Sequence, residues 1–193
     1  MRTDLFNRHA IVAACEFRQM KDAIDSGAGA IIYMNGDLND MVSSTFKEYC
    51  RQKQVFIHID LLKGLSNDKE SLRFIRKYVG PYGIVSTKSN IIKSAKKEGL
   101  VTIQRLFLID TKSFNNSIEA ISQNDPDCIE VMPAIAPSIV RSYKQQFPSI
   151  PIILGGLISE ESHISEAFKQ GADAVSLSKA SLWNFRYKDR VDA

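Results

Sequence analysis

Two apolar segments in the last quarter of the chain end in residues suited to holding an anion. The first, "IPIILGG", ends at Gly155 and Gly156, and the second, "AVSLSK", contains Ser176 and Ser178. Glycine lets a ligand approach the backbone closely, and hydroxyl and N–H groups donate hydrogen bonds to phosphate oxygens. The residues that follow, "KASLW", read as a short helix whose amino end favours negative charge. The coincidence favours a phosphate site, although the glycine pair could also form an ordinary strand-to-loop turn.

Polar residues end other apolar segments too, where they could bind the rest of a ligand or act on it. They are His58, Asp60, Ser86, Lys88, Gln104, Arg105 and Glu130. A lysine can form a Schiff base and a carboxylate can act as a general base, but the same groups can hold a small phosphate ester unchanged. No HExxH motif, nucleophile elbow or metal-ligand cluster fixes a reaction, and no metal is expected.

Each of these residues also has a purely structural interpretation. His58 could be a core histidine, and Asp60 could cap the loop that follows it. Lys88 and Glu130 could form a buried ion pair, and the serines could be small residues inside the fold. A structural interpretation must account for several strand ends at once, so a shared ligand pocket is the leading hypothesis.

Strand alternation predicts which side chains share a face. It groups His58 with Asp60, Ser86 with Lys88, Thr102 with Gln104, and Ser176 with Ser178, and we expect these groups inside the fold. The residues between them, such as Val85 and Ile103, are then expected to face helices.

The elements that must position these residues are eight apolar segments spread along the chain. They lie at 9–15, 30–35, 55–60, 83–88, 100–106, 127–133, 150–156 and 174–179. Most are continuously apolar, as parallel strands covered on both faces are, and amphipathic stretches of helical period separate them. The alternation predicts a compact α/β fold, a (β/α)8 TIM-type barrel, with residues 1–193 as a single domain. An open doubly wound sheet is the alternative, but no first-strand GxGxxG turn supports it.

Composition limits the class of protein. Apolar residues make up 44% of the chain and charged residues 24%, which is typical of globular proteins, and no apolar stretch is long enough to cross a bilayer. Three cysteines without CxxC spacing predict reduced thiols in a cytoplasmic protein. The net charge of +3 permits a nucleic-acid partner without indicating one. Basic residues cluster at Arg73, Arg76 and Lys77, at Lys93, Lys96 and Lys97, at Arg141 and Lys144, and in the tail "WNFRYKDRVDA". Such sets are more often solvated helix faces than binding sites. The aromatics of the tail suit base stacking, closure of the barrel or a dimer interface.

Several strings taken together resemble one family. "VFIHIDLLKGLSND", "GIVSTKSNIIKSAKKEGLVTIQRLFLID", "CIEVMPAIAP", "PIILGGLI" and "ADAVSLSKASLW" are similar to the glycerol-3-phosphate-responsive antiterminators, the regulatory proteins of bacterial glycerol uptake operons. The resemblance runs from about Ile11 to Trp183, in register with every predicted strand. The order HID, STK, TIQR and GGLI is specific, whereas each string alone is weak.

The resemblance implies a non-catalytic TIM barrel that binds glycerol 3-phosphate as its effector, without another cofactor. It further implies transcription antitermination, by RNA binding to the leader mRNA of genes of glycerol metabolism. The motifs carry over to His58–Asp60, Ser86–Lys88, Gln104–Arg105, Glu130 and Gly155–Gly156. We expect Gly155, Gly156, Ser176 and Ser178 to bind the effector phosphate and the other seven residues to make polar contacts. Where Pro-Gly is expected after the sixth strand, this chain has Pro133-Ala134, which gives that loop little weight in binding.

Two alternatives stay open on the residues alone. One is a barrel enzyme of the aldolase, epimerase or glycerol-phosphate transferase type that acts on a small phosphate ester. The other is a sensor that acts on a protein partner. A homo-oligomer is compatible with the sequence, and a membrane partner is not expected.

Overall fold

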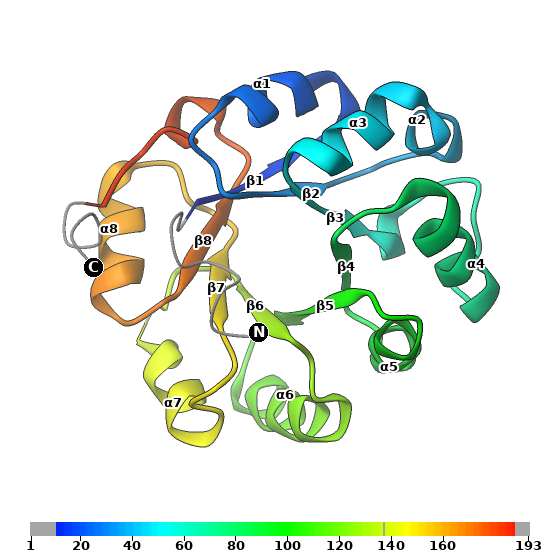
Figure 1. Cartoon of the computed structure of the whole chain (residues 1–193). Coiled ribbons are helices and arrows are strands. Elements are labelled where there is room, and N and C mark those ends of the chain that lie inside the picture. Colours follow the sequence, from blue (N-terminus) through cyan, green and yellow to red (C-terminus); the bar gives the residue numbers. More distant parts are fainter. Residues whose placement is uncertain (1–10, 137, 188–193) are drawn as a thin grey trace.

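The computed structural model describes residues 11–136 and 138–187, which form a closed barrel of eight parallel strands (Figure 1). The strands are β1 (Ile11–Cys15), β2 (Ala30–Tyr33), β3 (Gln54–His58), β4 (Gly83–Ser86), β5 (Val101–Phe107), β6 (Cys128–Met132), β7 (Ile152–Gly155) and β8 (Ala174–Leu177). Each strand pairs with its neighbours in sequence, and β8 closes the barrel on β1. The predicted TIM-type barrel is confirmed, and the open sheet is excluded.

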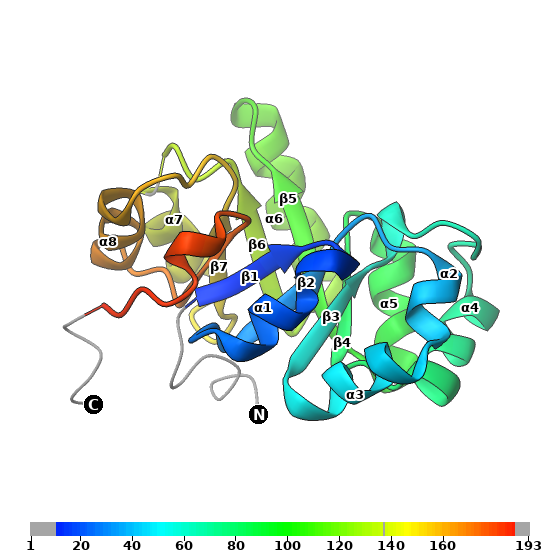
Figure 2. The same ribbon diagram turned by 90° about the horizontal axis from the view of Figure 1, so that it is seen from above.

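Helices surround the barrel, as the two orthogonal views show (Figures 1 and 2). They are α1 (Met20–Asp25), α2 (Leu38–Val42), α3 (Ser44–Gln52), α4 (Lys69–Phe74), α5 (Ser89–Lys97), α6 (Thr111–Asn124), α7 (Ile139–Gln146) and α8 (Glu161–Lys169). Two helices, α2 and α3, connect β2 to β3, and α4 continues into a π-helical turn at Ile75–Val79. After β8, within the described part of the chain, the only helical element is the 3-10 turn Ala180–Leu182. No described helix has the length and apolar character needed to cross a membrane.

The segment after that turn covers the barrel where the helix that follows the eighth strand lies in a regular TIM barrel. Trp183 is 1% exposed and its indole Nε1 donates to the Leu177 carbonyl at 3.0 Å. The ring of Tyr187 packs on Phe168, with centroids 5.1 Å apart. The tail aromatics therefore close the barrel, and a stacking role for Trp183 is wrong because its ring is buried. Lys188 and Arg190 of the same tail lie outside the described residues.

The barrel interior is a separate apolar cluster inside the strands. It contains Val12, Ala30, Ile32, Phe56, Val85, Ile103, Cys128, Ile153 and Ala174, while the larger core lies between the strands and the helices. Side chains of alternate residues fill the interior in layers, as in other barrels of this size. The next inward positions toward the carboxyl end of β3, β5, β6 and β8 are His58, Arg105, Glu130 and Ser176. The polar residues thus begin where this apolar cluster ends.

The prediction of which side chains of β4 and β5 point into the barrel is wrong. Val85 and Ile103 lie in the interior cluster, so Ser86, Thr102 and Gln104 face the helical side. Alternation is ambiguous on β5, because both of its faces carry polar residues. Partners outside the barrel decide which face points outward.

Thr102 and Gln104 are paired on the helical side of β5. The Thr102 hydroxyl donates to Asp127 Oδ2 at 2.9 Å, and the Gln104 amide oxygen accepts from Asn124 Nδ2 on α6 at 3.0 Å. Buried polar groups need such partners, so these bonds fix which face of β5 points outward. Arg105, one residue further along, consequently points into the barrel.

Candidate ligand site at the carboxyl ends of the strands

A cavity of about 310 Å³ opens at the carboxyl ends of the strands. Strand ends and the loops that follow them contribute to its wall, among them Glu16, Arg18, Met34, Asn35, Arg105, Met132, Gly156, Leu157, Ser176 and Ser178. The volume is at the small end of the range for ligand pockets, so the cavity fits a metabolite rather than a cofactor. This end of a TIM barrel is also where ligands of the fold bind.

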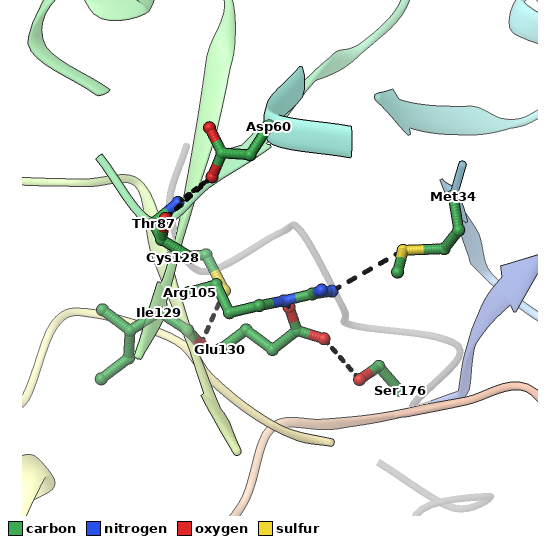
Figure 3. Close-up of polar contacts among 8 residues, drawn as sticks. All are labelled: Met34, Asp60, Thr87, Arg105, Cys128, Ile129, Glu130 and Ser176. Atoms are coloured by element: carbon green, nitrogen blue, oxygen red, sulfur yellow. Dashed lines mark hydrogen bonds and ion pairs between the residues drawn. The ribbon is translucent and has the colours of Figure 1, made fainter. Parts of the chain in front are cut away.

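Arg105 and Glu130 form a buried ion pair beneath the cavity (Figure 3). Arg105 Nε lies 2.7 Å from Glu130 Oε2, and the two side chains are 4% and 0% exposed. The other carboxylate oxygen, Oε1, accepts a hydrogen bond from the Ser176 hydroxyl at 2.5 Å. Both oxygens of Glu130 are therefore used within the barrel, and the carboxylate fixes the guanidinium at its Nε side.

The terminal nitrogens of Arg105 are left at the cavity wall. Among the described residues, the contact recorded for them is a 4.0 Å approach of Nη2 to Met34 Sδ. A guanidinium held at Nε presents its remaining N–H groups as a rigid fork that matches phosphate or carboxylate oxygens. The site can therefore recognise an anion through Arg105.

Gly155, the last residue of β7, and Gly156, which follows it, have different roles. A Cβ at Gly155 would lie 2.2 Å from Ser176 Oγ and 3.1 Å from Glu130 Oε1, so this glycine makes room for the buried network. Gly156 lines the cavity and has a φ of +77°, which a residue with a Cβ adopts at a cost. Of the predicted phosphate glycines, Gly156 is the one that a ligand can reach.

Ser176 of β8 and Ser178, just after this strand, also have different roles. Ser176 is buried and its hydroxyl serves Glu130, whereas Ser178 is exposed at the edge of the cavity. The adjacent Lys179 donates to the Ser159 carbonyl at 2.8 Å and so ties the loop after β8 to the loop after β7. Ser178 is accordingly the serine with a hydroxyl available to an incoming anion.

Asp60 belongs to a second cluster, at the ends of β3 and β4 (Figure 3). It accepts hydrogen bonds from Ser86 Oγ at 2.8 Å, from the Thr87 N–H at 2.7 Å and from Thr87 Oγ1 at 2.9 Å. Burial acts to raise the pKa of Asp60, but the hydrogen bonds from Thr87 and Ser86 outweigh it and hold that pKa below its ordinary value. These bonds give Asp60 and Ser86 a structural role between the two strands, and neither residue lines the cavity.

Lys88 is exposed where α5 begins, and it too lies outside the cavity wall. With the Asn67 amide oriented to satisfy both of its neighbours, its oxygen accepts from Lys88 Nζ at 3.1 Å. The alternative of a buried Lys88–Glu130 ion pair is wrong, because Arg105 is the partner of Glu130. Gln104, on the helical side of β5, is likewise away from the cavity, so its predicted contact with the ligand is not supported by its position.

His58 lies inside the barrel and is 4% exposed. Its Nδ1 has no hydrogen-bond partner among the described residues. Burial, with a further contribution from the nearby Arg105 charge, lowers the pKa of His58 to about 4. The imidazole is therefore neutral at physiological pH.

Four polar residues of the cavity, Glu16, Arg18, Gln19 and Asn35, lie after β1 and β2, where the sequence led to no predicted site residue. Glu16 follows β1, and its carboxylate accepts from Asn35 Nδ2 at 3.2 Å and lies 3.5 Å from Arg18 Nε. Asn35 follows β2 with a φ of +50°. The signal is present in the sequence, since Glu16 and Asn35 end apolar segments of the predicted period. The described residues contain no group of three or more His, Cys, Asp or Glu side chains arranged to hold a metal ion.

Comparison with known proteins identifies the family. The family model described as "Glycerol-3-phosphate responsive antiterminator" matches residues 10–183. This chain belongs to that family, and the resemblance of its motifs is confirmed. It is similar to "Uncharacterized protein YgcP" of Escherichia coli (strain K12), with 31% identity over 95% of this chain and 96% of the relative.

Two solved structures agree with this family assignment. The crystal structure of the glycerol uptake operon antiterminator regulatory protein from Listeria monocytogenes is 31% identical and has a TM-score of 0.87, over 94% of this chain and 98% of that one. A glycerol uptake operon antiterminator-related protein from Thermotoga maritima is 27% identical with a TM-score of 0.77, over 92% and 99% of the two chains. Family and fold together support a regulator of glycerol operons.

Proposed function

We propose that this antiterminator binds glycerol 3-phosphate in the cavity and then acts in the cytoplasm on the leader mRNA of glycerol-utilisation genes. The observation that carries the proposal is Arg105, a buried guanidinium held at Nε by Glu130 with its terminal nitrogens at a small cavity. A guanidinium held in this way presents N–H donors in the fork geometry that matches phosphate oxygens. No other cofactor is part of the proposal.

The effector has two chemically different ends, and the cavity has two kinds of wall. The phosphate would lie between the Arg105 nitrogens, the backbone at Gly156 and the Ser178 hydroxyl. The glycerol hydroxyls would bond to Glu16 and Asn35, which follow β1 and β2 and offer acceptors and donors to the cavity. Glu130 neutralises Arg105, so backbone N–H groups and the exposed Arg18 would offset the rest of the dianion's charge.

A phosphate bound in this way would bridge three segments that are separate in sequence: β5 through Arg105, the loop after β7 through Gly156 and the loop after β8 through Ser178. The loop after β7 also touches the loop after β6, because Ala134 donates its N–H to the Gly156 carbonyl at 3.2 Å. A ligand shifts a conformational equilibrium by its differential affinity for the states. Glycerol 3-phosphate would therefore favour the arrangement of these loops in which all three contacts form.

An enzyme is the second candidate, and the geometry gives it less support. Lys88, the lysine considered for a Schiff base, is exposed outside the cavity, and Glu130 is engaged by both Arg105 and Ser176. A general base needs a free acceptor within reach of the substrate. We therefore propose a non-catalytic effector site.

Calorimetry with glycerol 3-phosphate tests the site, and a phosphorus NMR time course of the same sample tests for turnover. The wild type should bind the ester and return it unchanged. Arg105→Lys keeps the charge but loses the fork and should weaken binding at least tenfold, since a bond to a charged group contributes about 1.5 to 3 kcal/mol. Arg141→Lys, an exposed arginine on α7, is the matched control and should bind as the wild type does. Consumption of the ester would favour the enzyme, and equal affinity of both variants would overturn the placement of the phosphate.

Binding of the leader RNA of the organism's own glycerol operon tests the output. The affinity should rise when glycerol 3-phosphate is added and fall with salt, as a phosphate-contacting protein requires. Affinity that does not respond to the ester would contradict the regulator hypothesis.

A further inference from the structure

The helices α4 and α5 carry an excess of positive charge on the side of the barrel away from β8 (Figure 1). Segments 69–79 and 89–98 together contain seven lysines and arginines and two glutamates, a net charge of +5, whereas the whole chain has +3. Segments 139–146 and 161–169, which include α7 and α8, have three basic and two acidic residues. The positive charge of this protein is therefore concentrated on one pair of helices.

Acidic residues neutralise part of this charge. Glu98 pairs with Arg73 at 3.2 Å and with Lys69 at 3.9 Å, Glu70 pairs with Arg73 at 2.8 Å, and Asp125 pairs with Lys96 at 2.9 Å. These ion pairs leave four exposed cations, Arg76, Lys77, Lys93 and Lys97, for which no ion pair is formed within residues 11–136 and 138–187. These cations lie on two neighbouring elements, since Lys69 and Arg73 of α4 pair with Glu98 at the end of α5. Four unneutralised cations on neighbouring helices form a surface that favours a polyanion.

An aromatic ring stands among these cations. Tyr78 is 52% exposed, its ring packs on Phe74 with centroids 5.2 Å apart, and Lys77 Nζ lies 5.0 Å from its centroid. Cations in the last turn of a helix are common because they complement the helix dipole, which accounts for Arg76 and Lys97 singly. The dipole does not account for an exposed tyrosine held in place beside a lysine, and that pairing suits a base stacked on the ring with its phosphate on the amine.

We propose that this face, defined by Arg76, Lys77, Tyr78, Lys93 and Lys97, binds a single-stranded segment of RNA. The inference rests on the proposed function and names the surface through which it acts. The effector cavity is lined by residues at the ends of β1, β2 and β5 to β8, and none of its described lining residues belongs to α4 or α5. RNA and glycerol 3-phosphate can therefore be bound at the same time. Any coupling between the two sites is then transmitted through the barrel and is reciprocal.

The test uses fluorescence anisotropy with a labelled single-stranded RNA of about 16 nucleotides, the upper end of common site sizes. The variant Arg76→Gln/Lys77→Gln/Lys93→Gln/Lys97→Gln should bind weakly. Its slope of log affinity against log salt should be smaller by about 0.7 for each RNA phosphate that it no longer neutralises, or about 3 for four phosphates. The matched control Lys112→Gln/Arg141→Gln/Lys169→Gln/Arg186→Gln removes the same charge from other faces and should keep the wild-type slope.

Variants of Tyr78 test the contribution of base stacking separately from that of charge. Tyr78→Ala should weaken binding about tenfold with an unchanged salt slope, whereas Tyr78→Phe keeps a stacking ring and should bind as the wild type does. Circular dichroism and glycerol 3-phosphate calorimetry check that each variant is folded and that its cavity is intact.

The outcomes distinguish this surface from the proposed function. The RNA-binding surface is overturned if the wild type binds RNA and the quadruple variant keeps the wild-type salt slope. It is also overturned if the RNA affinity of the quadruple variant falls no more than that of the control. Either result leaves the proposed function standing. A wild type that binds neither this RNA nor the operon leader, with or without the ester, overturns both.

Discussion

Arg105 and Glu130 face each other across the β5–β6 pair and meet inside the barrel. They are direct partners in the strand register, and Arg105 Nε lies 2.7 Å from Glu130 Oε2. Strand register therefore brings the charges together, and the Ser176 hydroxyl on β8 completes the hydrogen bonding of the carboxylate. The pair thus connects three strands below the cavity and orients the guanidinium toward it.

Neutralising one member of this pair should destabilise the protein. Glu130→Gln leaves the Arg105 charge buried without its counter-ion, which should lower the free energy of unfolding by about 3 to 5 kcal/mol. Urea denaturation followed by circular dichroism measures this decrease. Glu48→Gln, which breaks an exposed pair with Arg51, is the control and should change stability little. Equal effects of the two substitutions would contradict the assignment of Arg105–Glu130 as a tightly coupled buried pair.

Gly155 should be required because of Ser176 rather than because of a ligand. Gly155→Ala adds a Cβ that would lie 2.2 Å from Ser176 Oγ, so β7 and β8 must separate or the Ser176–Glu130 bond must break. Overpacking of this kind costs about 1 to 3 kcal/mol. Ser176→Gly removes the clashing oxygen, so the double variant Gly155→Ala/Ser176→Gly should be less destabilised than the sum of the two single variants. If urea denaturation shows that the double variant loses as much unfolding free energy as the two single variants together, the two positions do not interact.

The barrel could be predicted from the sequence because its signal is repeated eight times. Apolar segments such as "AIIYMN" and "VFIHID" are too uniformly apolar for one-sided strands, and each alternates with a segment of helical period. Local signals agree with the pattern, as where Asp68 caps α4 by accepting from the Ser71 N–H.

The site was harder to predict, since strand parity depends on partners far away in the sequence. Gln104 and Arg105 are adjacent polar residues on β5, and local pattern alone cannot say which of them points inward. The hydrogen bond of Gln104 with Asn124 on α6 and the ion pair of Arg105 with Glu130 decide this. Both partners are about twenty or more residues further along the chain, and a single sequence does not reveal them.

His58 should make the protein less stable in acid. Burial lowers the pKa of His58 to about 4, so between pH 6.5 and 4 the unfolded chain binds a proton that the folded protein does not. Stability should therefore be fully present above pH 6.5 and fall by about 3 kcal/mol as the pH drops to 4. Arg105 acts in the same direction as burial, whereas Asp60 and Glu130 oppose it.

Denaturant titrations at a series of pH values measure this dependence. His58→Gln removes the titrating group and should flatten the curve between pH 6.5 and 4. His163→Gln, on the exposed face of α8, must keep the wild-type slope if that slope is to be assigned to His58. A wild-type curve that is already flat over this range would contradict a neutral, buried His58.

Alanine variants at Gly156 and Gly80 distinguish the loss of a contact with the effector from the cost of backbone strain. Both have positive φ, +77° and +72°, so alanine at either position should cost about 1 to 2 kcal/mol of stability. The added Cβ meets nothing within 4 Å at Gly80 and approaches Met132 Cε at 3.4 Å at Gly156. Met132 and Gly156 both line the cavity, whereas Gly80 ends the helical turn after α4.

Gly156→Ala should therefore weaken glycerol 3-phosphate binding about tenfold, because the phosphate can no longer approach the backbone closely enough for a charge-assisted hydrogen bond. Gly80→Ala should be destabilised to a similar extent and keep the wild-type affinity. Calorimetry at a temperature where both variants are folded makes the comparison. Equal affinity of the two variants would show that the backbone at Gly156 does not contact the phosphate, and would move the anion toward Arg105 and the loop of Arg18.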